Sequence, residues 1–446
     1  MNINIPWQCE KILKRFNEHD IEAYLVGGCV RDSLLGKEPK DWDICTAALP
    51  EQVIILFEDE KVILTGLKHG TVTVLIGGMP IEITTYRIDG EYEDNRRPKE
   101  VFFTDSLRED LSRRDFTINA LAYHPDKGVI DYFDGIGDLE RGLIRCVGDA
   151  ASRYQEDGLR IMRAVRFACV LNFQFEAETE QAIKEYSFLL GNIAKERIQV
   201  EFDKILTSSW AAYGLDTLAR LNCFPYFLPE ICHTWQFNQE GGLHQYDVFG
   251  HTLKMVSLVP ADVVLRLTAL LHDIGKPYVW QNIDGKDEFP QHEVVSTELA
   301  EHILERMRYD NKTIAQVKRL IAEHTRGLLP KPYLMRRAVA DLGVEGVRQL
   351  IAIKRADIQA HNEILEKDPL TIFDDMEREL DRILAQEECC SLKQLAVTGK
   401  EVIALGAKGR GVGDILDALL ELVLKYPEQN EKTYLLAQAE KMVNEA

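Results

Sequence analysis

The sequence predicts an α+β fold, with a small sheet and flanking helices in a head and only helices after it. In residues 1–148, short β-rich runs alternate with helical patterns, as in AYLVGG, KVILTG, TVTVLIG and IEITTYRI. From Ala150 onward the apolar residues recur instead at spacings of three and four, as in GLRIMRAVRFACVL and RIQVEFDKIL. We therefore expect the sheet to end where the first third of the chain ends.

The chain of 446 residues is too long for one ordinary core. Pro, aromatic and Gly residues mark a connection over 223–244, and GKDEFPQHE is expected to be a loop between helices. A strongly acidic run, EKDPLTIFDDMERELDRILAQEE, marks a last boundary near 366–395. We predict a head, a helical neck, a helical body and a helical tail, at 1–148, 149–220, 221–366 and 367–446.

Composition narrows the class of protein. Apolar residues make up 46% and charged residues 28% of the chain, and no tract of about 18 uninterrupted apolar residues could span a bilayer. The first residues lack the basic and apolar regions of a secretory signal, so we expect a cytoplasmic location. Nine scattered cysteines without a CxxC pair indicate buried thiols rather than disulfides or a thiolate zinc site.

The net charge of −20 argues against a nonspecific coat on a polyanion, because phosphate binding needs clustered Lys and Arg. Arginines nevertheless crowd the region between Arg87 and Arg166. They could form a local basic track or a solvated face laced with ion pairs, and charge alone does not separate the two.

A β-rich run ends in Gly27 and Gly28 and leads into a predicted helix that carries Arg31. Two glycines allow close approach of the backbone to an anion, a helix N-terminus offers N–H groups, and an arginine adds charge-assisted hydrogen bonds. The pattern therefore suits a phosphate, although Gly-Gly also marks ordinary strand-to-helix turns.

Asp41 and Asp43, in KDWDI, are separated by one residue, so on a strand both carboxylates project from the same face. Such a pair can hold magnesium for a displacement in which one ion activates the attacking hydroxyl and another neutralises the leaving pyrophosphate. An isolated pair of this kind is more often exposed in a turn. Glu82 is a further candidate ligand in an alternating strand, where it shares a face with Thr84. An exposed position on an edge strand is the alternative for Glu82.

Five segments together resemble the ordered motifs of the bacterial class II tRNA nucleotidyltransferases and poly(A) polymerases. They are GGCVRDSLLGKEPKDWDICT, RRPKEVFFTDSLREDLSRRDFTINALAY, DYFDGIGDLERGLIRCV, RYQEDGLRIMRAVRFA and ERIQVEFDKIL. A weaker match, QLAVTGKEVIALGAKGRGVGDIL, is similar to the tail of the same family. The resemblance implies a polymerase β-type nucleotidyltransferase fold in the head, with Asp41 and Asp43 as catalytic metal ligands. It also implies that Gly27, Gly28 and Arg31 lie beside the triphosphate.

The segment EDGLRIMR opens a predicted helix on which Asp157, Arg160 and Arg163 share a face. Cytosine and adenine both present an amino donor beside an unprotonated ring nitrogen, whereas uracil and guanine present a carbonyl beside an N–H. Asp157 can accept from the amino group while Arg160 donates to the ring nitrogen, and a wrong base would leave polar groups unpaired at about 1–3 kcal/mol each. In the resembled family this motif acts as an amino-acid template. A surface i, i+3 ion pair is the alternative interpretation.

Other residues of these motifs are candidates for nucleotide binding, since paired arginines beside small polar residues suit phosphate and ribose hydroxyls. Ion pairing within the fold is the competing explanation. The Arg-rich stretch 92–110 resembles the family's flexible loop, which is implicated in the switch from C to A, and its full length disfavours a CC-only enzyme. The candidates are Arg113, Arg114, Asp115, Asn119, Arg163 and Arg166.

The body segment carries histidines and carboxylates that resemble an HD-type metal domain, with LLHDIGKP as the most recognisable part. Imidazoles and carboxylates are suitable ligands of first-row metals, and a helical bundle can bring them together from different helices. Any one such histidine is more often a core or surface residue. The predicted ligands are His251, His272, Asp273 and Asp357, with His292 and His324 for a second metal position.

Together these features predict template-independent addition of CCA to the 3′ end of tRNA from CTP and ATP, with Mg²⁺ as cofactor and pyrophosphate as product. Addition of A alone and poly(A) synthesis share nearly all of the motifs and stay open, although an acidic chain favours tRNA over mRNA tails. An HD phosphohydrolase whose head only binds is the alternative from another class, and a non-catalytic RNA-binding protein is a third. Candidate phosphate contacts of the tRNA are Arg336, Arg337, Lys354, Lys400, Lys408 and Arg410.

Overall fold

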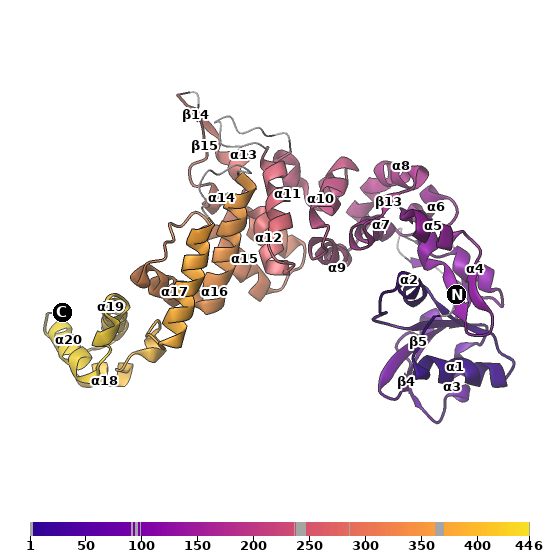
Figure 1. Ribbon diagram of the computed structural model, residues 1–446, viewed down its shortest axis with the longest axis horizontal. Helices are drawn as coiled ribbons and strands as arrows, with labels where there is room; N and C mark the ends of the chain where they lie inside the picture. Colours follow the sequence, from indigo (N-terminus) through magenta and orange to yellow (C-terminus); the bar gives the residue numbers. More distant parts are fainter. Residues whose placement is uncertain are drawn as a thin grey trace. The chain divides into compact units, whose positions relative to one another are not determined.

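The computed structural model describes residues 3–90, 92, 93, 97, 98, 100–235, 237, 247–284, 286–361 and 370–445. It forms two compact units, Met1–Cys232 and His233–Ala446 (Figure 1). The large sheet lies wholly in the first unit and is followed by helices, so the predicted α+β fold with a helical remainder is confirmed.

The first unit is built on a seven-stranded sheet with the order β11-β10-β1-β2-β5-β4-β3. β2 and β5 are parallel, and every other neighbouring pair is antiparallel. Burial alternates along β4 and β5, as expected for a sheet with one face in the core. The strands are β1 (Ala23–Val26), β2 (Asp43–Thr46), β3 (Lys61–Ile63), β4 (Thr71–Ile76), β5 (Met79–Thr85), β10 (Leu121–His124) and β11 (Gly128–Asp131).

Helix α1 (Trp7–Glu18) buries Cys9, Ile12, Leu13 and Phe16, whose spacing places them on one face. The ring of Phe16 meets that of Phe57 edge to face, with centroids 5.6 Å apart. The head also contains α2 (Gly28–Leu34), α3 (Pro50–Leu56), α4 (Leu107–Ser112) and α5 (Gly135–Arg141).

Two short ribbons lie in or directly before the stretch 92–110 that is predicted to be the flexible loop, and residues 91, 94–96 and 99 lie outside the described part of the chain. The ribbons pair β6 (Arg87–Asp89) with β9 (Val101–Phe103), and β7 (Tyr92–Glu93) with β8 (Arg97–Pro98).

The neck helices complete the first unit. A parallel pair of short strands, β12 (Leu143–Ile144) and β13 (Gln174–Phe175), joins them to the head. The central helix α7 approaches α10 closely at Gly214, where a Cβ atom would lie 2.4 Å from the Sγ atom of Cys169. The helices are α6 (Ala150–Glu156), α7 (Leu159–Leu171), α8 (Ala177–Tyr186), α9 (Lys195–Leu206) and α10 (Ala211–Arg220).

The second unit is mainly helical, and its long helix α16 is broken at Gly343, where φ is +73°. The helices are α11 (Val248–Leu258), α12 (Val263–Leu271), α13 (Lys276–Val279), α14 (His292–Arg306), α15 (Asn311–Glu323), α16 (Pro332–His361), α17 (Thr371–Ala385), α18 (Gly399–Ala404), α19 (Gly411–Lys425) and α20 (Lys432–Glu445).

One prediction for this unit is wrong, because GKDEFPQHE is not only a loop. Its first part pairs as an antiparallel hairpin of β14 (Gln281–Ile283) and β15 (Lys286–Glu288), and α14 already begins at His292. The hairpin forms because Asp284 adopts a φ of 52° and is followed by Gly in the sequence, a combination typical of tight hairpin turns.

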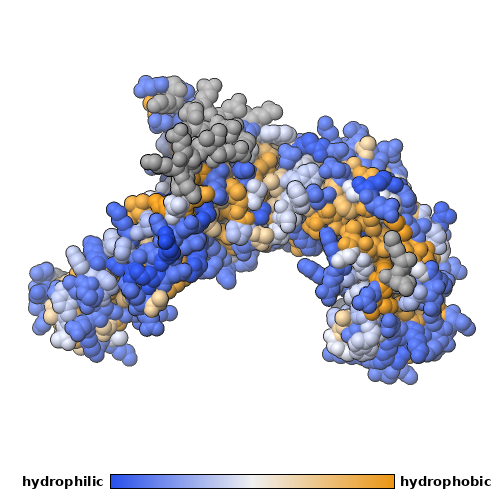
Figure 2. All heavy atoms as spheres, viewed as in Figure 1, coloured by the Kyte–Doolittle hydropathy of each residue, from blue (hydrophilic) through white to orange (hydrophobic). Residues whose placement is uncertain are grey.

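Every cysteine except Cys232 is buried, as the scattered pattern predicted. Figure 2 shows hydrophilic residues spread over both units on the face in view. Within the described ranges, no helix is long and apolar enough to cross a membrane.

Candidate active site and metal centre

The turn between β1 and α2 is formed by Gly27 and Gly28. Gly27 has a φ of 79°, and a Cβ atom there would lie 2.9 Å from the Nη1 atom of Arg114. Only glycine therefore fits this turn, for both its backbone conformation and its contact. The structure thus places Arg114 directly beside the predicted phosphate turn.

Arg31 on α2 is buried and already hydrogen-bonded. Its Nη1 atom donates to the Oδ1 atom of Asn119 at 2.6 Å, and its Nε atom donates to Asp32 at 2.8 Å. Asn119 in turn donates to Asp115 at 3.0 Å, and Asp115 accepts from the Nε atom of Arg163 on α7 at 2.8 Å. Four of the predicted nucleotide-binding residues therefore form one chain of contacts from the head to the neck.

The predicted carboxylates also come together. Asp43 begins β2, whereas Asp41 lies just before the strand and not on it, which corrects the expectation that both are strand residues. Both carboxylates line one cavity, whereas the intervening Trp42 is buried. Glu82 on β5 is the register partner of Asp43, and β5 is an interior strand between β2 and β4, so an edge-strand position for Glu82 is excluded.

Two neighbouring carboxylates contribute to the charge state of Asp43. Burial raises the pKa of Asp43 to about 6, and the nearby charges of Glu82 and Asp41 act in the same direction, while Arg114 opposes them. Closely placed acidic oxygens that repel one another are a donor set that fits a hard divalent cation. Asp41, Asp43 and Glu82 therefore stay the predicted metal ligands of the head. Among the described residues, the groups of three or more ligands with atoms within 4.8 Å of one another all lie in the second unit.

Asp110 on α4 supports two of the predicted nucleotide-binding arginines, and the sequence reasoning missed it. Its buried carboxylate accepts from the Nε and Nη2 atoms of Arg113 at 3.0 and 2.7 Å and lies 3.6 Å from Arg114. The spacings of three and four residues to the two arginines were the available signal. Asp110 fixes both guanidinium groups, and through Arg114 it supports the turn at Gly27.

The base-reading segment differs from its prediction. Asp157 has extended backbone and precedes α7, so it does not share a helix face with Arg160 and Arg163. Its carboxylate accepts from Leu159 N at 3.1 Å and from the Nη2 atom of Arg197 on α9 at 2.8 Å. Helix α7 begins at Leu159, three residues after the predicted start at Glu156, because Glu156 still belongs to α6 and the extended Asp157 separates the two helices.

Arg160 is buried and pairs with Glu156, and its Nη2 atom donates to the carbonyl of Arg113 at 3.0 Å. The predicted surface ion pair between Arg160 and Asp157 is not the arrangement found. Arg197 was missed by the sequence reasoning, and since it lies 40 residues from Asp157 no local spacing signalled it.

A cavity of about 670 Å³ lies in the first unit, and Asp41 and Asp43 line it together with Gly28 and Arg31. Helices α7 and α9 contribute its other side through Arg166 and Lys204, among others. The Nε atom of Arg166 lies 2.7 Å from the carboxylate of Glu201. The phosphate turn and the carboxylates therefore open onto one shared space.

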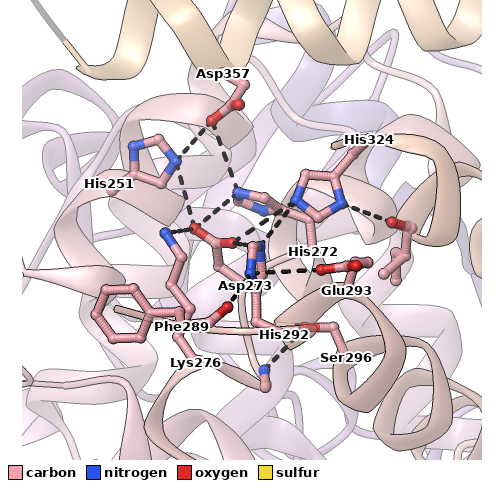
Figure 3. Close-up of polar contacts among 12 residues, drawn as sticks. His251, His272, Asp273, Lys276, Phe289, His292, Glu293, Ser296, His324 and Asp357 are labelled. Atoms are coloured by element: carbon pink, nitrogen blue, oxygen red, sulfur yellow. Dashed lines mark hydrogen bonds and ion pairs between the residues drawn. The ribbon is translucent and has the colours of Figure 1, made fainter. Parts of the chain in front are cut away.

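In the second unit, all six predicted metal ligands converge (Figure 3). The Oδ2 atom of Asp273 lies 3.2 Å from the Nε2 atom of His272 and 3.9 Å from that of His251, and Asp357 lies 3.1 Å from His251. The Oδ1 atom of Asp273 lies instead 3.3 and 3.9 Å from the Nε2 atoms of His292 and His324. The two carboxylate oxygens of Asp273 thus face two separate groups of ligands.

Two residues beside this cluster were missed. The Nζ atom of Lys276 lies 2.7 Å from Asp273, and the Nδ1 atom of His361 lies 3.3 Å from Asp357. Each follows its partner by three or four residues, which was a readable signal.

Burial lowers the pKa of His251, and it lowers that of His324 to about 4, so both imidazoles are neutral at pH 7. Although burial opposes it, the charges of His272 and Lys276 hold the pKa of Asp273 well below its usual value. Neutral imidazoles beside ionised carboxylates fit first-row divalent metals.

Two predicted RNA contacts are wrong. Arg336 is buried, donating to the carbonyl of Leu424 at 2.7 Å and pairing with Glu388, and Lys354 donates to the carbonyl of His324 at 2.6 Å. Both cations therefore stabilise the folded protein through contacts within it. Arg337 is half-exposed and ion-paired, and the three candidates of the tail, Lys400, Lys408 and Arg410, are exposed.

Comparison with protein families gives three matches along the chain. Residues 23–145 match the poly A polymerase head domain, residues 172–234 the probable RNA and SrmB-binding site of polymerase A, and residues 244–360 the HD domain. The carboxylate trio, which is Asp41, Asp43 and Glu82, lies in the first match. The six converging ligands of the second unit lie in the third match.

Two curated relatives are named CCA-adding enzyme. That of Lactobacillus johnsonii is 55% identical over 194 residues, 44% of this chain and 48% of the relative. That of Bacillus cytotoxicus is 49% identical over 261 residues, 57% of this chain and 65% of the relative. The chain therefore spans less than two thirds of the length of either relative.

A solved structure covers nearly the whole chain. The crystal structure of the Bacillus stearothermophilus CCA-adding enzyme in complex with CTP matches with a TM-score of 0.74 and 29% identity, over 98% of both chains.

Proposed function

We propose, for a chain whose head belongs to the poly A polymerase head-domain family, that it adds CCA to the 3′ end of tRNA without a template. The substrates are CTP and ATP, and pyrophosphate leaves. The observation that carries this proposal is the presence, in one compact unit, of the carboxylate trio and of Asp157 held by Arg197. The names of the curated relatives and the CTP complex of the solved neighbour support it.

The head performs the transfer. Asp41 and Asp43 are the catalytic metal ligands, with Glu82 as a third donor, and Mg²⁺ held there would activate the attacking hydroxyl and stabilise the leaving phosphates. Gly27 and Gly28 offer their turn to the triphosphate, and Arg114 lies beside that turn. The ordered arginines cost no reorganisation when the nucleotide binds, since Asp110 and Asn119 already fix them.

The neck, residues 149–220, chooses the base. Both oxygens of Asp157 accept from Arg197, at 3.4 and 2.8 Å, which fixes the carboxylate. A second lone pair on the oxygen at 2.8 Å can accept from the amino group of cytosine or adenine. Arg160 and Arg163 supply donors on the adjacent helix, and Arg166 extends this cationic side to the cavity. Uracil and guanine would leave these groups unpaired, at about 1–3 kcal/mol per group.

The remaining segments have supporting roles in this proposal. The tail, residues 367–446, contacts tRNA through exposed cations such as Lys400, Lys408 and Arg410. The reaction takes place in the cytoplasm, where its substrates are found. Addition of A alone and poly(A) synthesis are the alternatives with the same chemistry.

A second candidate function belongs to the body, residues 221–366. The arrangement of ligands around the two oxygens of Asp273 favours a divalent-metal phosphohydrolase. The other ligands are His251, His272, His292, His324 and Asp357. This activity uses none of the residues of the head, so the two functions can be tested separately.

The test compares Asp41→Ala with Asp273→Ala in the full chain. CMP and AMP incorporation is measured on tRNA transcripts that lack CCA or end in C or CC, and hydrolysis is measured with bis-p-nitrophenyl phosphate and Mn²⁺. We expect Asp41→Ala to abolish incorporation and Asp273→Ala to abolish only hydrolysis. Incorporation that survives Asp41→Ala would overturn the main proposal, and incorporation of AMP alone on every transcript would replace CCA addition by A addition.

A further inference from the structure

Three lysines line the cavity that holds Asp41 and Asp43. Lys37 and Lys40 are exposed in the loop between α2 and β2, and in the part of the chain that the structure describes neither has an ion-pair partner. Lys204, near the end of α9, is half-exposed, and its nearest carboxylate oxygen, on Glu201, lies 3.7 Å away. These ammonium groups can therefore turn to a bound anion at little cost.

The arginines around the same site differ from these lysines. Arg31, Arg113 and Arg163 are each held by a carboxylate or amide oxygen at 2.6–2.8 Å. Fixed guanidinium groups suit a ligand that occupies one position. Flexible ammonium groups suit a phosphate chain whose position changes.

The reaction requires two phosphate positions at this site, one for the nucleotide and one for the acceptor strand. In a phosphoryl transfer the attacking and leaving oxygens stand roughly in line on opposite sides of the phosphorus atom. If the turn at Gly28 and Arg31 holds the leaving phosphates, the attacking hydroxyl approaches the carboxylates from the other side. Lys40 precedes Asp41 directly, and Lys204 and Ser208 line the same cavity from the neck.

We propose that Lys37, Lys40 and Lys204 bind the last backbone phosphates of the acceptor RNA strand and so place its terminal hydroxyl at Asp41 and Asp43. This inference rests on the proposed nucleotide addition. The terminal base of the acceptor changes after each addition, so the strand must be held by contacts that do not depend on the base. The strand also moves by one nucleotide per addition, and mobile lysine side chains can follow it.

The first experiment measures KM separately for tRNA and for CTP in Lys204→Ala and Lys40→Ala. We expect the KM for tRNA to rise about tenfold, the value for one lost charged hydrogen bond, with the KM for CTP unchanged. The matched control is Lys184→Ala, which removes an exposed charge from α8 outside the cavity and should leave both constants unchanged.

The salt dependence of tRNA binding gives a second readout that a loss of fold would not mimic. Each lost contact to a single-strand phosphate should reduce the slope of log K against log salt by about 0.7. Lys184→Ala should keep the slope of the unmodified chain.

A third experiment uses the unmodified chain and needs no turnover. tRNA lacking CCA is oxidised with periodate, so that its terminal ribose carries a dialdehyde, and the imine formed with a neighbouring lysine is reduced with cyanoborohydride. We expect mass spectrometry to find the label on Lys37, Lys40 or Lys204. Labelling only in the tail would overturn the inference.

The outcomes separate this inference from the proposed function. If the unmodified chain extends no tRNA, the proposed function fails. If it extends tRNA but the lysine variants raise the KM for CTP, or leave both constants and the salt slope unchanged, only the acceptor site is wrong.

Discussion

Arg197 on α9 donates to the carboxylate of Asp157 at 2.8 Å, although the two residues are 40 positions apart. Asp157 also accepts from the backbone of Leu159 at the start of α7. The carboxylate is therefore fixed from two neck helices at once. A group that reads bases by hydrogen bonds needs such a fixed orientation, since a mobile carboxylate could turn to suit a wrong base.

Replacing Arg197 by Ala should relax the choice of base. Without its partner, Asp157 can rotate, so we expect incorporation of UMP relative to CMP to rise about ten- to a hundredfold, as for one or two lost polar contacts. Competition between UTP and CTP on tRNA lacking CCA measures the ratio. Arg220→Ala is the control, because Arg220 pairs with Glu180 on the neck surface across the same separation of 40 residues. An unchanged ratio in Arg197→Ala would contradict the fixed-carboxylate explanation.

Gly27→Ala should impair nucleotide binding as well as stability. Its φ of 79° costs an L-residue about 1–3 kcal/mol, and the new Cβ would displace Arg114. Gly78→Ala has a similar φ of 85° but open space around it, so it isolates the backbone cost. We expect both variants to unfold earlier in urea and only Gly27→Ala to raise the KM for CTP. Equal KM values for CTP in the two variants would show that the position of Arg114 beside the turn does not contribute to nucleotide binding.

Asp115 should make the first unit sensitive to acid. Burial favours its protonated form, yet Arg163 and Asn119 hold its pKa at about 2, below the ordinary 3.8. A lowered folded-state pKa stabilises the fold above pH 3.8, and this stabilisation is lost as the pH falls towards 2. Asp115→Asn should lower the free energy of unfolding at pH 7 by about 2–3 kcal/mol, since the ion pair between Asp115 and the half-buried Arg163 is lost.

The difference between Asp115→Asn and the unmodified chain should shrink between pH 4 and about pH 2. Urea titrations at several pH values measure it. Asp59→Asn is the control, because Asp59 pairs with Arg15 on the surface and should change stability little at any pH. A difference that stays constant with pH would mean that Asp115 is not ionised in the folded protein.

The body should bind two divalent metal ions, one at each group of ligands. We expect chelated protein reloaded with Mn²⁺, then filtered in magnesium buffer, to retain one ion fewer in His324→Ala than in the unmodified chain. Asp273→Ala should lose both, because its two oxygens face both ligand groups. Metal analysis by mass spectrometry gives the stoichiometry. Equal losses in the two variants would indicate a single shared ion.

Patterns of periodicity predicted the elements of the head well, because β4 and β5 alternate in burial and α1 is amphipathic. The start of α7 was missed, since α6 runs directly up to it and only Gly158 and the extended Asp157 separate the two helices. The β14–β15 hairpin was missed because its short strands carry few apolar residues.

Motifs identified the groups at the candidate site but not their supports. The order of the H, HD and D residues along the chain predicted that they converge, and the structure brings their ligand atoms together. They are His251, His272, Asp273 and Asp357. Asp110 was overlooked although it lies three residues before Arg113, and Arg197 gave no local signal at all. Supporting residues are chosen by tertiary geometry, and a single sequence records that geometry only where the partners are neighbours.

The pairing of Asp157 with Arg197 also bears on how the product sequence is inherited. A nucleic-acid template can change its product by one base substitution, but here the information resides in the orientation of a carboxylate that two separate helices enforce. A single codon change at either position disturbs the orientation and lowers fidelity before any new preference exists. In the proposed reaction this arrangement would protect tRNA ends from gradual drift, because a different terminal sequence would require coordinated changes at distant codons.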